Sequence, residues 1–289
     1  MAALASAAAV CTTPASSASA AMAPLAQPLP LQTMTSSSST SPAMRVEEIG
    51  GGFDLLQSPP STTALQSPDA FYPSSMANTQ WKVQRAVTSV EGDAGQAAIA
   101  WRCLGGGPDE RAFTSKRTEV YETKFVVAPE SMDKTAAVEY VYEGKTVRCA
   151  ILDRAYEMSS RVGIAGIAAE DNISWDPTVN PNLLTYKRHG DKVELVVVQR
   201  KIEPPSGETG FGSDELVRIQ SSAGGVFGGL NVYRAARVRR RWRRGFDETT
   251  GKRVVDGLEI VTTYRVLDGI AGVEMPTSTT KSRIRLVEM

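Results

Sequence analysis

The stretch Trp81–Thr88 reads WKVQRAVT, and its side chains alternate in character. Trp81, Val83, Arg85 and Val87 occupy every second position, with mainly polar residues between them. A repeat of two residues is that of a β-strand with one face buried and the other in solvent. The stretch therefore predicts a half-buried strand.

Similar runs, rich in β-branched and aromatic residues, recur along the chain and are separated by short turns. Together with the first stretch they predict about ten strands. The further runs lie at 97–103, 118–127, 138–142, 146–152, 183–187, 193–200, 215–221, 232–244, 258–267 and 281–287.

The connections between these runs favour antiparallel pairing. Glu143–Lys145, His189–Asp191 and Thr250–Lys252 each predict a hairpin in which Gly supplies a positive φ. Only residues 153–162 have helical spacing and composition, and Asp153 is expected to cap that helix. Strands joined by short hairpins, with hardly a crossover helix, pair antiparallel. We therefore predict an all-β antiparallel barrel, closed or nearly closed, with one short helix; a β-sandwich is the alternative.

Residues 1–44 form a leader of different composition, without any Asp, Glu, Lys, Arg or His and dominated by Ala, Ser, Thr and Pro. Such a segment buries too little apolar surface to fold, so we expect it to be disordered. Its acid-free composition is typical of a chloroplast transit peptide. Ala18-Ser19-Ala20 has the form of a signal-peptidase site, so the stroma and the thylakoid lumen both stay open. A secretory signal fits less well because the positive n-region is missing, and an uncleaved disordered tail is the remaining alternative.

A domain boundary is predicted near residue 67. Residues 45–67 are still rich in Gly, Ser and Pro. We therefore assign 1–67 to the transit peptide and a disordered linker, and 68–289 to a single β-barrel domain. The longest apolar runs, such as 162–169, are far shorter than the roughly 20 residues of a membrane-spanning helix, so no transmembrane span is expected. The chain has 32 basic and 32 acidic residues, so an argument from charge must be local.

The residue types that most enzymes use are scarce. The chain has one His, His189, in a predicted turn, so a Ser–His or Cys–His pair and a transition-metal site are not expected. Cys103 and Cys149 lack C-x-x-C spacing and are predicted to be free thiols buried in strands. The glycine-rich segment 224–229 is not followed by Lys-Ser/Thr, so it does not predict a phosphate loop. We lean towards a non-enzymatic protein without metal or cofactor, although carboxylate catalysis stays open.

An arginine-rich run is the unusual charge feature. Residues 234–244 contain seven arginines, and no acid occurs between Glu215 and Asp247. On one face of a strand, successive guanidinium groups would lie about 6.5 Å apart and repel one another. Either acids on adjacent strands, for instance Glu259 or Glu215, form a ladder with them, or the face binds phosphate or carboxylate groups, including lipid headgroups and, less readily, RNA. One face carries Arg237, Arg239, Arg241 and Arg243, and the other carries Val238, Arg240, Trp242 and Arg244.

Four short motifs occur in order along the chain. They are Phe71-Tyr72-Pro73 ahead of Trp81-Lys82-Val83, then Asp153-Arg154-Ala155-Tyr156, Glu259–Arg265 and Arg283-Ile284-Arg285-Leu286. Together they resemble an uncharacterised domain-of-unknown-function family of cyanobacteria and chloroplasts, and the resemblance covers residues 67–289. It implies a lipocalin-like (calycin) barrel and a chloroplast address. It implies no reaction, because the family's activity is not established.

The lipocalin resemblance also implies a structural role for one tryptophan. Lipocalins place a tryptophan on the first strand, usually after Gly-x, beneath an arginine from the last strand. Trp81 matches that tryptophan, although Asn78-Thr79-Gln80 precedes it without the glycine. Arg283 or Arg285 is therefore expected over the Trp81 ring, a contact worth about 1 to 2 kcal/mol if desolvated. The predicted ligand-binding residues are Asp153, Arg154, Tyr156 and Trp242.

The predicted barrel suggests a binding function. A barrel of about eight to ten strands is wide enough for one small ligand. The leading hypothesis is a plastid protein that binds a small apolar or amphipathic molecule, such as a lipid, a carotenoid or a tetrapyrrole. The alternatives are a lyase or isomerase acting on such a pigment, and an assembly or interaction factor that uses the arginine face against photosynthetic complexes or an anionic membrane surface. An apolar cavity would favour the binding function. Convergent Asp, Tyr and Arg side chains in the cavity would favour catalysis, and a filled interior would favour the interaction role.

Overall fold

The computed structural model describes most of the chain from residue 67 onwards. The described residues are 53–54, 67–107, 118–132, 138–164, 173–188, 190–205, 210–222, 231–267 and 270–289. The chain divides into two units, Met1–Glu48 and Ile49–Met289, and every described residue belongs to the second. The leader, His189 and the segment 224–229 lie outside the described residues, so the expectations for them stay predictions.

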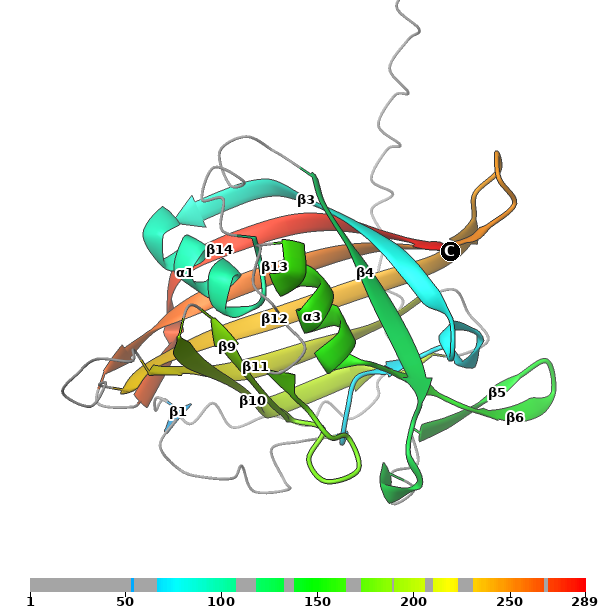
Figure 1. Cartoon of the computed structure of the whole chain (residues 1–289), viewed down its shortest axis with the longest axis horizontal. Coiled ribbons are helices and arrows are strands. Elements are labelled where there is room, and N and C mark those ends of the chain that lie inside the picture. Colours follow the sequence, from blue (N-terminus) through cyan, green and yellow to red (C-terminus); the bar gives the residue numbers. More distant parts are fainter. Residues whose placement is uncertain are drawn as a thin grey trace, which may run out of the picture. The chain divides into compact units, whose positions relative to one another are not determined.

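One antiparallel sheet dominates the described domain (Figure 1). Its strands follow the order β2-β7-β4-β3-β14-β13-β12-β11-β10-β9-β8, and a short strand, β1 (Phe53–Asp54), pairs with β14. The all-β antiparallel class is therefore confirmed. The strands are β2 (Phe71–Tyr72), β7 (Ala150–Leu152), β4 (Thr118–Val127), β3 (Gln80–Gly92), β14 (Ile270–Glu288), β13 (Arg253–Leu267), β12 (Asn231–Phe246), β11 (Gly210–Ser222), β10 (Asp191–Glu203), β9 (Leu183–Arg188) and β8 (Ile173–Ser174).

The sheet curls into a half-barrel rather than a closed barrel. β2 and β8 stand at the two ends of the strand order and, in the described part of the chain, do not pair with each other. Two α-helices, α1 (Ala94–Cys103) and α3 (Arg154–Ile164), lie over the same face of the long strands (Figure 1). We call this the concave face and the opposite one the convex face. A separate hairpin is formed by β5 (Glu139–Tyr142) and β6 (Lys145–Arg148).

Strand β3 shows why the alternating pattern predicted the sheet correctly. Trp81, Val83, Arg85 and Val87 are all buried, and Trp81 is only 1% exposed. The residues between them point to the convex face and are exposed or half-buried. The sheet core is therefore built from every second residue, as a strand with one covered face requires.

Helix α1 corrects the sequence analysis, which predicted a strand at 97–103. The helix begins after Asp93, whose Oδ1 accepts hydrogen bonds from the amides of Gly95 (2.8 Å) and Gln96 (3.1 Å). This cap satisfies two of the amides that a helix leaves unpaired at its start. The described domain therefore has two short α-helices instead of one.

Helix α3 confirms the helix predicted from residue 153. Asp153 Oδ1 accepts a hydrogen bond from the amide of Tyr156 at 2.9 Å, so the predicted capping role is correct. The hairpin glycines Gly144 and Gly251 have φ of 76° and 67°, the left-handed values that the turns were predicted to need. Two short 3₁₀ helices, Ser74–Met76 and Glu130–Met132, complete the described elements.

Candidate functional site

Buried ion pairs are the main polar feature of the concave face. A first network joins α3 and the strands β10 and β11 to Asp69, which lies just before β2. Arg154 Nη2 lies 2.6 Å from Asp69 Oδ1 and 3.1 Å from Glu215 Oε1. Arg200 Nε lies 2.6 Å from the same Glu215 oxygen, and the Arg200 side chain is fully buried. Burial alone would raise the pKa of Glu215, but the guanidinium groups around it outweigh burial and hold the pKa well below its ordinary value.

A second network lies between β3, β4, β12, β13 and α3. Arg240 Nε donates to Glu259 Oε2 at 2.8 Å, and Arg85 donates to the other oxygen of the same carboxylate. Burial alone would raise the pKa of Glu259, but the charges of Arg85 and Arg240 outweigh burial and lower the pKa to about 2. The remaining pairs join Arg85 and Arg161 to Glu119 and Arg161 to Glu157, at 3.5 to 3.9 Å.

These two networks are balanced in charge. Five guanidinium groups face five carboxylates. The networks as a whole therefore carry no net charge and do not by themselves attract an ion. The members are Arg85, Arg154, Arg161, Arg200 and Arg240 with Asp69, Glu119, Glu157, Glu215 and Glu259.

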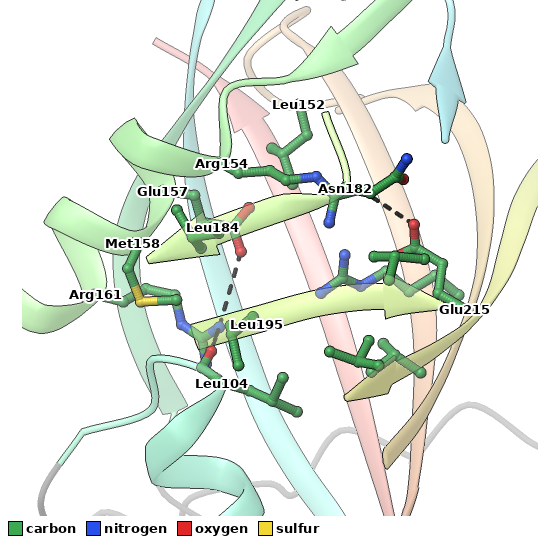
Figure 2. Close-up of a pocket in the computed structure, with 14 residues that line it drawn as sticks. Leu104, Leu152, Arg154, Glu157, Met158, Arg161, Asn182, Leu184, Leu195 and Glu215 are labelled. Atoms are coloured by element: carbon green, nitrogen blue, oxygen red, sulfur yellow. Dashed lines mark hydrogen bonds and ion pairs between the residues drawn. The ribbon is translucent and has the colours of Figure 1, made fainter. Parts of the chain in front are cut away.

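Between these networks lies a central pocket of about 80 Å³. Figure 2 shows Arg154, Glu157, Met158 and Arg161 of α3 facing it, with Leu184 and Leu195 on its sheet side. Ligand pockets usually measure about 300 to 1,000 Å³, so this one holds a few waters or a very small group. Within the described residues, Nε of both Arg154 and Arg161 is buried and has no hydrogen-bond acceptor. Water or another neutral acceptor in the central pocket would satisfy them.

A larger end pocket, of about 420 Å³, lies between α1 and the strands β9 to β12. Its volume falls within the usual range for a small-molecule site. Apolar and charged side chains share its wall, as they do in the central pocket, and its greater volume makes it the better suited of the two to an amphipathic molecule. It is lined by Ile99, Arg102, Cys103, Tyr186, Arg188, Asp191, Val193, Ser221 and Arg234.

The four predicted ligand-binding residues do not form one site. Arg154 lines the central pocket, and Trp242 lines a void of about 20 Å³ at the other end of the concave face, beside Tyr72 and Phe211. Asp153 caps α3, and the Tyr156 hydroxyl donates to Glu122 Oε2 at 3.0 Å. Only Arg154 and Trp242 therefore reach a concave pocket.

The arginine run forms most of strand β12, and its predicted sidedness is confirmed. Arg237, Arg239, Arg241 and Arg243 lie on the convex face, while Val238 and Trp242 pack in the interior. The acids that the sequence analysis named for this face, Glu215 and Glu259, lie on the concave face instead, because both alternate with convex residues in their own strands.

Other acids meet part of the convex row. Arg237 pairs with Asp214 at 2.6 Å and Arg241 pairs with Glu203. Within the described residues, Arg239 and Arg243 have no ion pair. Acids therefore pair with two of the four arginines of the row.

A convex groove of about 660 Å³ extends from this row across β13 and β14 to β3. Arg241, Arg243, Arg283 and Arg285 line it, with Asp256 as the acid among its lining residues. Arg285 Nη2 also pairs with Asp247 Oδ2 at 2.8 Å. The groove therefore presents an excess of guanidinium groups to solvent.

Trp81 is covered by a different arginine from the one expected. Arg253 of β13 places Cζ 5.8 Å from the centre of the Trp81 ring. Arg283 and Arg285 belong to the convex face of β14, whereas Trp81 faces the interior with Ile284 and Leu286. The period of two along β14 separates the two sets, so neither predicted arginine contacts the ring.

Neither cysteine lies in a strand, contrary to the sequence analysis. Cys103 is the last residue of α1, and Cys149 lies between β6 and β7; within the described residues neither forms a disulfide. Burial raises the pKa of Cys149 to about 12 and also raises the pKa of Cys103, so both are thiols at neutral pH. The described residues contain no cluster that could hold a metal ion and no helix long and apolar enough to span a membrane.

Several concave-face residues were not predicted, although the sequence held a signal for some. Arg85 shares the period of Trp81, Val83 and Val87, which marks it as an interior arginine that needs an acid. Arg240 likewise alternates with Val238 and Trp242, which marks it as a second interior arginine. Cys103 of the end pocket carries no comparable local signal, because it reaches the pocket only through the packing of α1.

Comparison with known proteins identifies a family. A family model described as a domain of unknown function, DUF6816, matches residues 64–286. Comparisons with curated proteins and with solved structures give no match. The resemblance to a domain-of-unknown-function family is therefore confirmed.

Proposed function

Because the chain belongs to the DUF6816 family, whose description names no activity, we propose a function from its concave face. The protein is a non-enzymatic chloroplast protein that binds one small amphipathic molecule between the sheet and α1. The observation that carries this proposal is the end pocket, which has a ligand-sized volume of about 420 Å³ and a wall of both apolar and polar side chains.

The apolar part of the wall suits a short hydrocarbon. Ile99 from α1 and Val193 from β10 line the pocket together with the ring of Tyr186. The Tyr186 hydroxyl is already engaged, since it donates to Cys103 O at 2.6 Å, and its ring is left as an apolar surface. Burying a chain of a few methylene groups here contributes about 0.8 kcal/mol per CH₂.

Pocket size ranks the candidate ligands. The volume of the end pocket suits a small lipid or fatty-acid-like molecule. A carotenoid or a tetrapyrrole is larger and would also need the central pocket, which measures only about 80 Å³. Helix α3 closes that pocket and is tied at both ends, by Arg154 to Asp69 and by Arg161 to Glu119. The small amphipathic ligand is therefore the leading proposal.

Two further properties are part of the proposal. The leader composition supports import into the chloroplast, to the stroma or the thylakoid lumen. The curled antiparallel half-barrel supports a distant relation to calycins as a fold analogy.

Extraction of the native protein tests the function directly. The protein purified from its own chloroplasts is expected to release one organic molecule into solvent, in about equal molar amount, detected by mass spectrometry. Ile99→Trp fills the end pocket from α1 and is expected to remove the bound molecule. Gln96→Trp places the same side chain on the exposed side of α1 and is the matched control. An extract without any bound molecule, or one unchanged in Ile99→Trp, would contradict the proposal.

The convex groove favours a second candidate function, contact with an anionic membrane surface. Within the described residues, Arg243 and Arg283 line the groove without an ion pair. Guanidinium groups near an anionic bilayer contribute about 1 kcal/mol each, and salt screens the attraction. The double variant Arg243→Gln/Arg283→Gln is expected to lose salt-sensitive binding to vesicles of anionic lipid. Equal binding by wild type and variant would exclude this role for the groove.

A further inference from the structure

The end pocket lacks the charge balance of the two ion-pair networks. The two ion-pair networks match five guanidinium groups with five carboxylates. The end pocket is lined by Arg102, Arg188 and Arg234 but by a single acid, Asp191. Arg102 and Asp191 make other interactions as well. The positive charges of the other two arginines, Arg188 and Arg234, need a negative partner.

Arg188 is only 9% exposed and has neutral partners. Its Nη1 donates to Arg102 O at 2.7 Å and to Gly106 O at 3.0 Å, at the carboxyl end of α1. These carbonyls and the helix dipole supply about half of an opposite charge. Asp191 stands opposite Arg188 in the β9–β10 ladder, and within the described residues Arg188 has no ion pair. The Arg188 charge is thus only partly neutralised in a largely desolvated position.

Arg234 reaches the same pocket from β12. Its Nη1 donates to Ser221 Oγ at 3.1 Å, which is a neutral acceptor. Within the described part of the chain Arg234 has no ion pair. A guanidinium group has five N–H donors, so one bond to a hydroxyl leaves most of them for another acceptor.

The other groups of the wall do not supply the missing negative charge. Burial raises the pKa of the Cys103 thiol, even though the guanidinium groups of Arg234, Arg188 and Arg102 lower it. Burial likewise raises the pKa of Tyr186 well above its ordinary value. Both residues are therefore neutral at physiological pH. Cys103 lines the end pocket together with Arg102, Arg188 and Arg234.

We propose that the end pocket binds the anionic head of its ligand, a carboxylate or a phosphate, through Arg188 and Arg234, with the hydrocarbon part against Ile99 and Val193. Only the hydrocarbon part of this inference rests on the proposed function. The two guanidinium groups would bind the same anion even if the ligand had no hydrocarbon chain. Guanidinium and carboxylate or phosphate form short, paired hydrogen bonds, which explains why arginine stands at these positions.

The experiment compares four probes on the full-length protein by calorimetry: octanoate, octyl phosphate, 1-octanol and inorganic phosphate. At least one of the two octyl anions is expected to bind ten times or more tightly than octanol and to weaken as salt is raised. The ratio of octanoate to octyl phosphate affinity separates a carboxylate from a phosphate head. Protection of Cys103 from iodoacetamide, measured on its peptide at alkaline pH where part of the thiol ionises, places the bound anion in the end pocket.

The key variant is Arg234→Gln, because Arg188→Gln would also remove a cap of α1. Arg234→Gln is expected to weaken binding of the octyl anion by at least tenfold and to leave octanol within about twofold. Arg239→Gln is the matched control. It removes an arginine from the same strand on the opposite face and is expected to change neither affinity.

Each outcome separates this inference from the proposed function. If octanol and the octyl anions bind equally tightly, the proposed anion site is wrong. The same follows if Arg234→Gln does not change the affinity for the octyl anion. Both results remain compatible with an amphipathic ligand. Binding of inorganic phosphate with Cys103 protection, without binding of any octyl compound, supports the anion site and contradicts the amphipathic ligand. If none of the four probes binds, both fail.

Discussion

Arg240 Nε on β12 lies 2.8 Å from Glu259 Oε2 on the adjacent strand β13, on the concave face of the sheet. The two residues are directly opposite each other in the β12–β13 ladder, so the ion pair is fixed by the strand register. Arg85 approaches the same carboxylate from β3. One buried acid thus holds two guanidinium groups from strands on either side of the β13–β14 hairpin.

Glu259→Gln is expected to destabilise the protein strongly. The change leaves the charges of Arg85 and Arg240 without their shared carboxylate in a buried position, which costs about 3 to 5 kcal/mol. Glu203→Gln is the matched control, because Glu203 pairs with Arg241 but is half exposed, and its loss is expected to cost less than about 1 kcal/mol. Urea unfolding of the two variants measures the difference. Similar free energies of unfolding would show that the interior pair is as weak as a surface pair.

Acid is expected to unfold the protein through the same carboxylates. The pKa of Glu259 is about 2 in the folded protein, and that of Glu215 also lies below its ordinary value. The stabilisation is therefore fully present above the unfolded-state pKa of about 4.3 and is lost as the pH falls towards 2. The free energy of unfolding should be flat from pH 7 to about 5.5 and then fall by about 1.4 kcal/mol per pH unit for each carboxylate. A flat profile from pH 5 down to pH 3 would contradict the depressed pKa values.

Gly257→Ala tests the packing at the Trp242 end of the concave face. A Cβ at residue 257 would overlap Trp242 Cε3 and Cζ3, so the indole must shift against Tyr72 and Phe211. We expect a loss of about 1 to 3 kcal/mol in the free energy of unfolding and a change in the near-ultraviolet circular dichroism. Gly245→Ala is the control on β12, because its Cβ would meet Val254 Cγ2 at an ordinary 3.7 Å. Equal stabilities of the two variants would mean that Trp242 is loosely packed.

Residue alternation predicted the sheet and the sides of its strands. The convex position of Arg237, Arg239, Arg241 and Arg243 follows from the period of two alone, and the structure agrees. What alternation does not give is the partner of each charge. Glu215 and Glu259 were assigned to the wrong face because the register between strands, which depends on the whole sheet, decides which residues are opposite each other.

Helix α1 could not be told from a strand by its apolar run. Residues 97–103 are short and apolar, and periodicity does not distinguish a short buried helix from a buried strand. The Asp93 cap, which lies before this run, was the missing signal. The end pocket was missed for the same reason, since Cys103 and Ile99 reach Arg188 and Arg234 only when this segment is a helix lying on the sheet.

The leader gives a prediction that is independent of the fold. Because residues 1–44 carry no charged side chain and are rich in Ala and Ser, the chloroplast form is expected to begin between Ala20 and Ser67. Amino-terminal sequencing of the protein isolated from chloroplasts measures this directly. A sequence that starts at Met1 or Ala2 would show that the leader is retained, and recovery of the protein outside chloroplasts would contradict the address.

The convex arginine row provides the last prediction, because neighbouring members of the row differ in their partners. Arg237 holds Asp214 with two hydrogen bonds, Nε to Oδ1 at 2.6 Å and Nη2 to Oδ2 at 3.0 Å. Both side chains are about one-third exposed, so solvent weakens the pair, and Arg237→Gln is expected to cost about 0.5 to 1 kcal/mol.

Arg239 lies between Arg237 and Arg241 on the same face and, within the described residues, has no acid partner. Arg239→Gln removes a repulsion without breaking a pair, so the free energy of unfolding should stay unchanged or rise by about 0.2 to 0.5 kcal/mol. Urea unfolding at low and at high salt separates the two effects, since salt screens repulsion between exposed charges and should abolish the gain in Arg239→Gln. If Arg239→Gln destabilised the protein as much as Arg237→Gln at low salt, Arg239 would be part of a structural ladder and not an uncompensated charge.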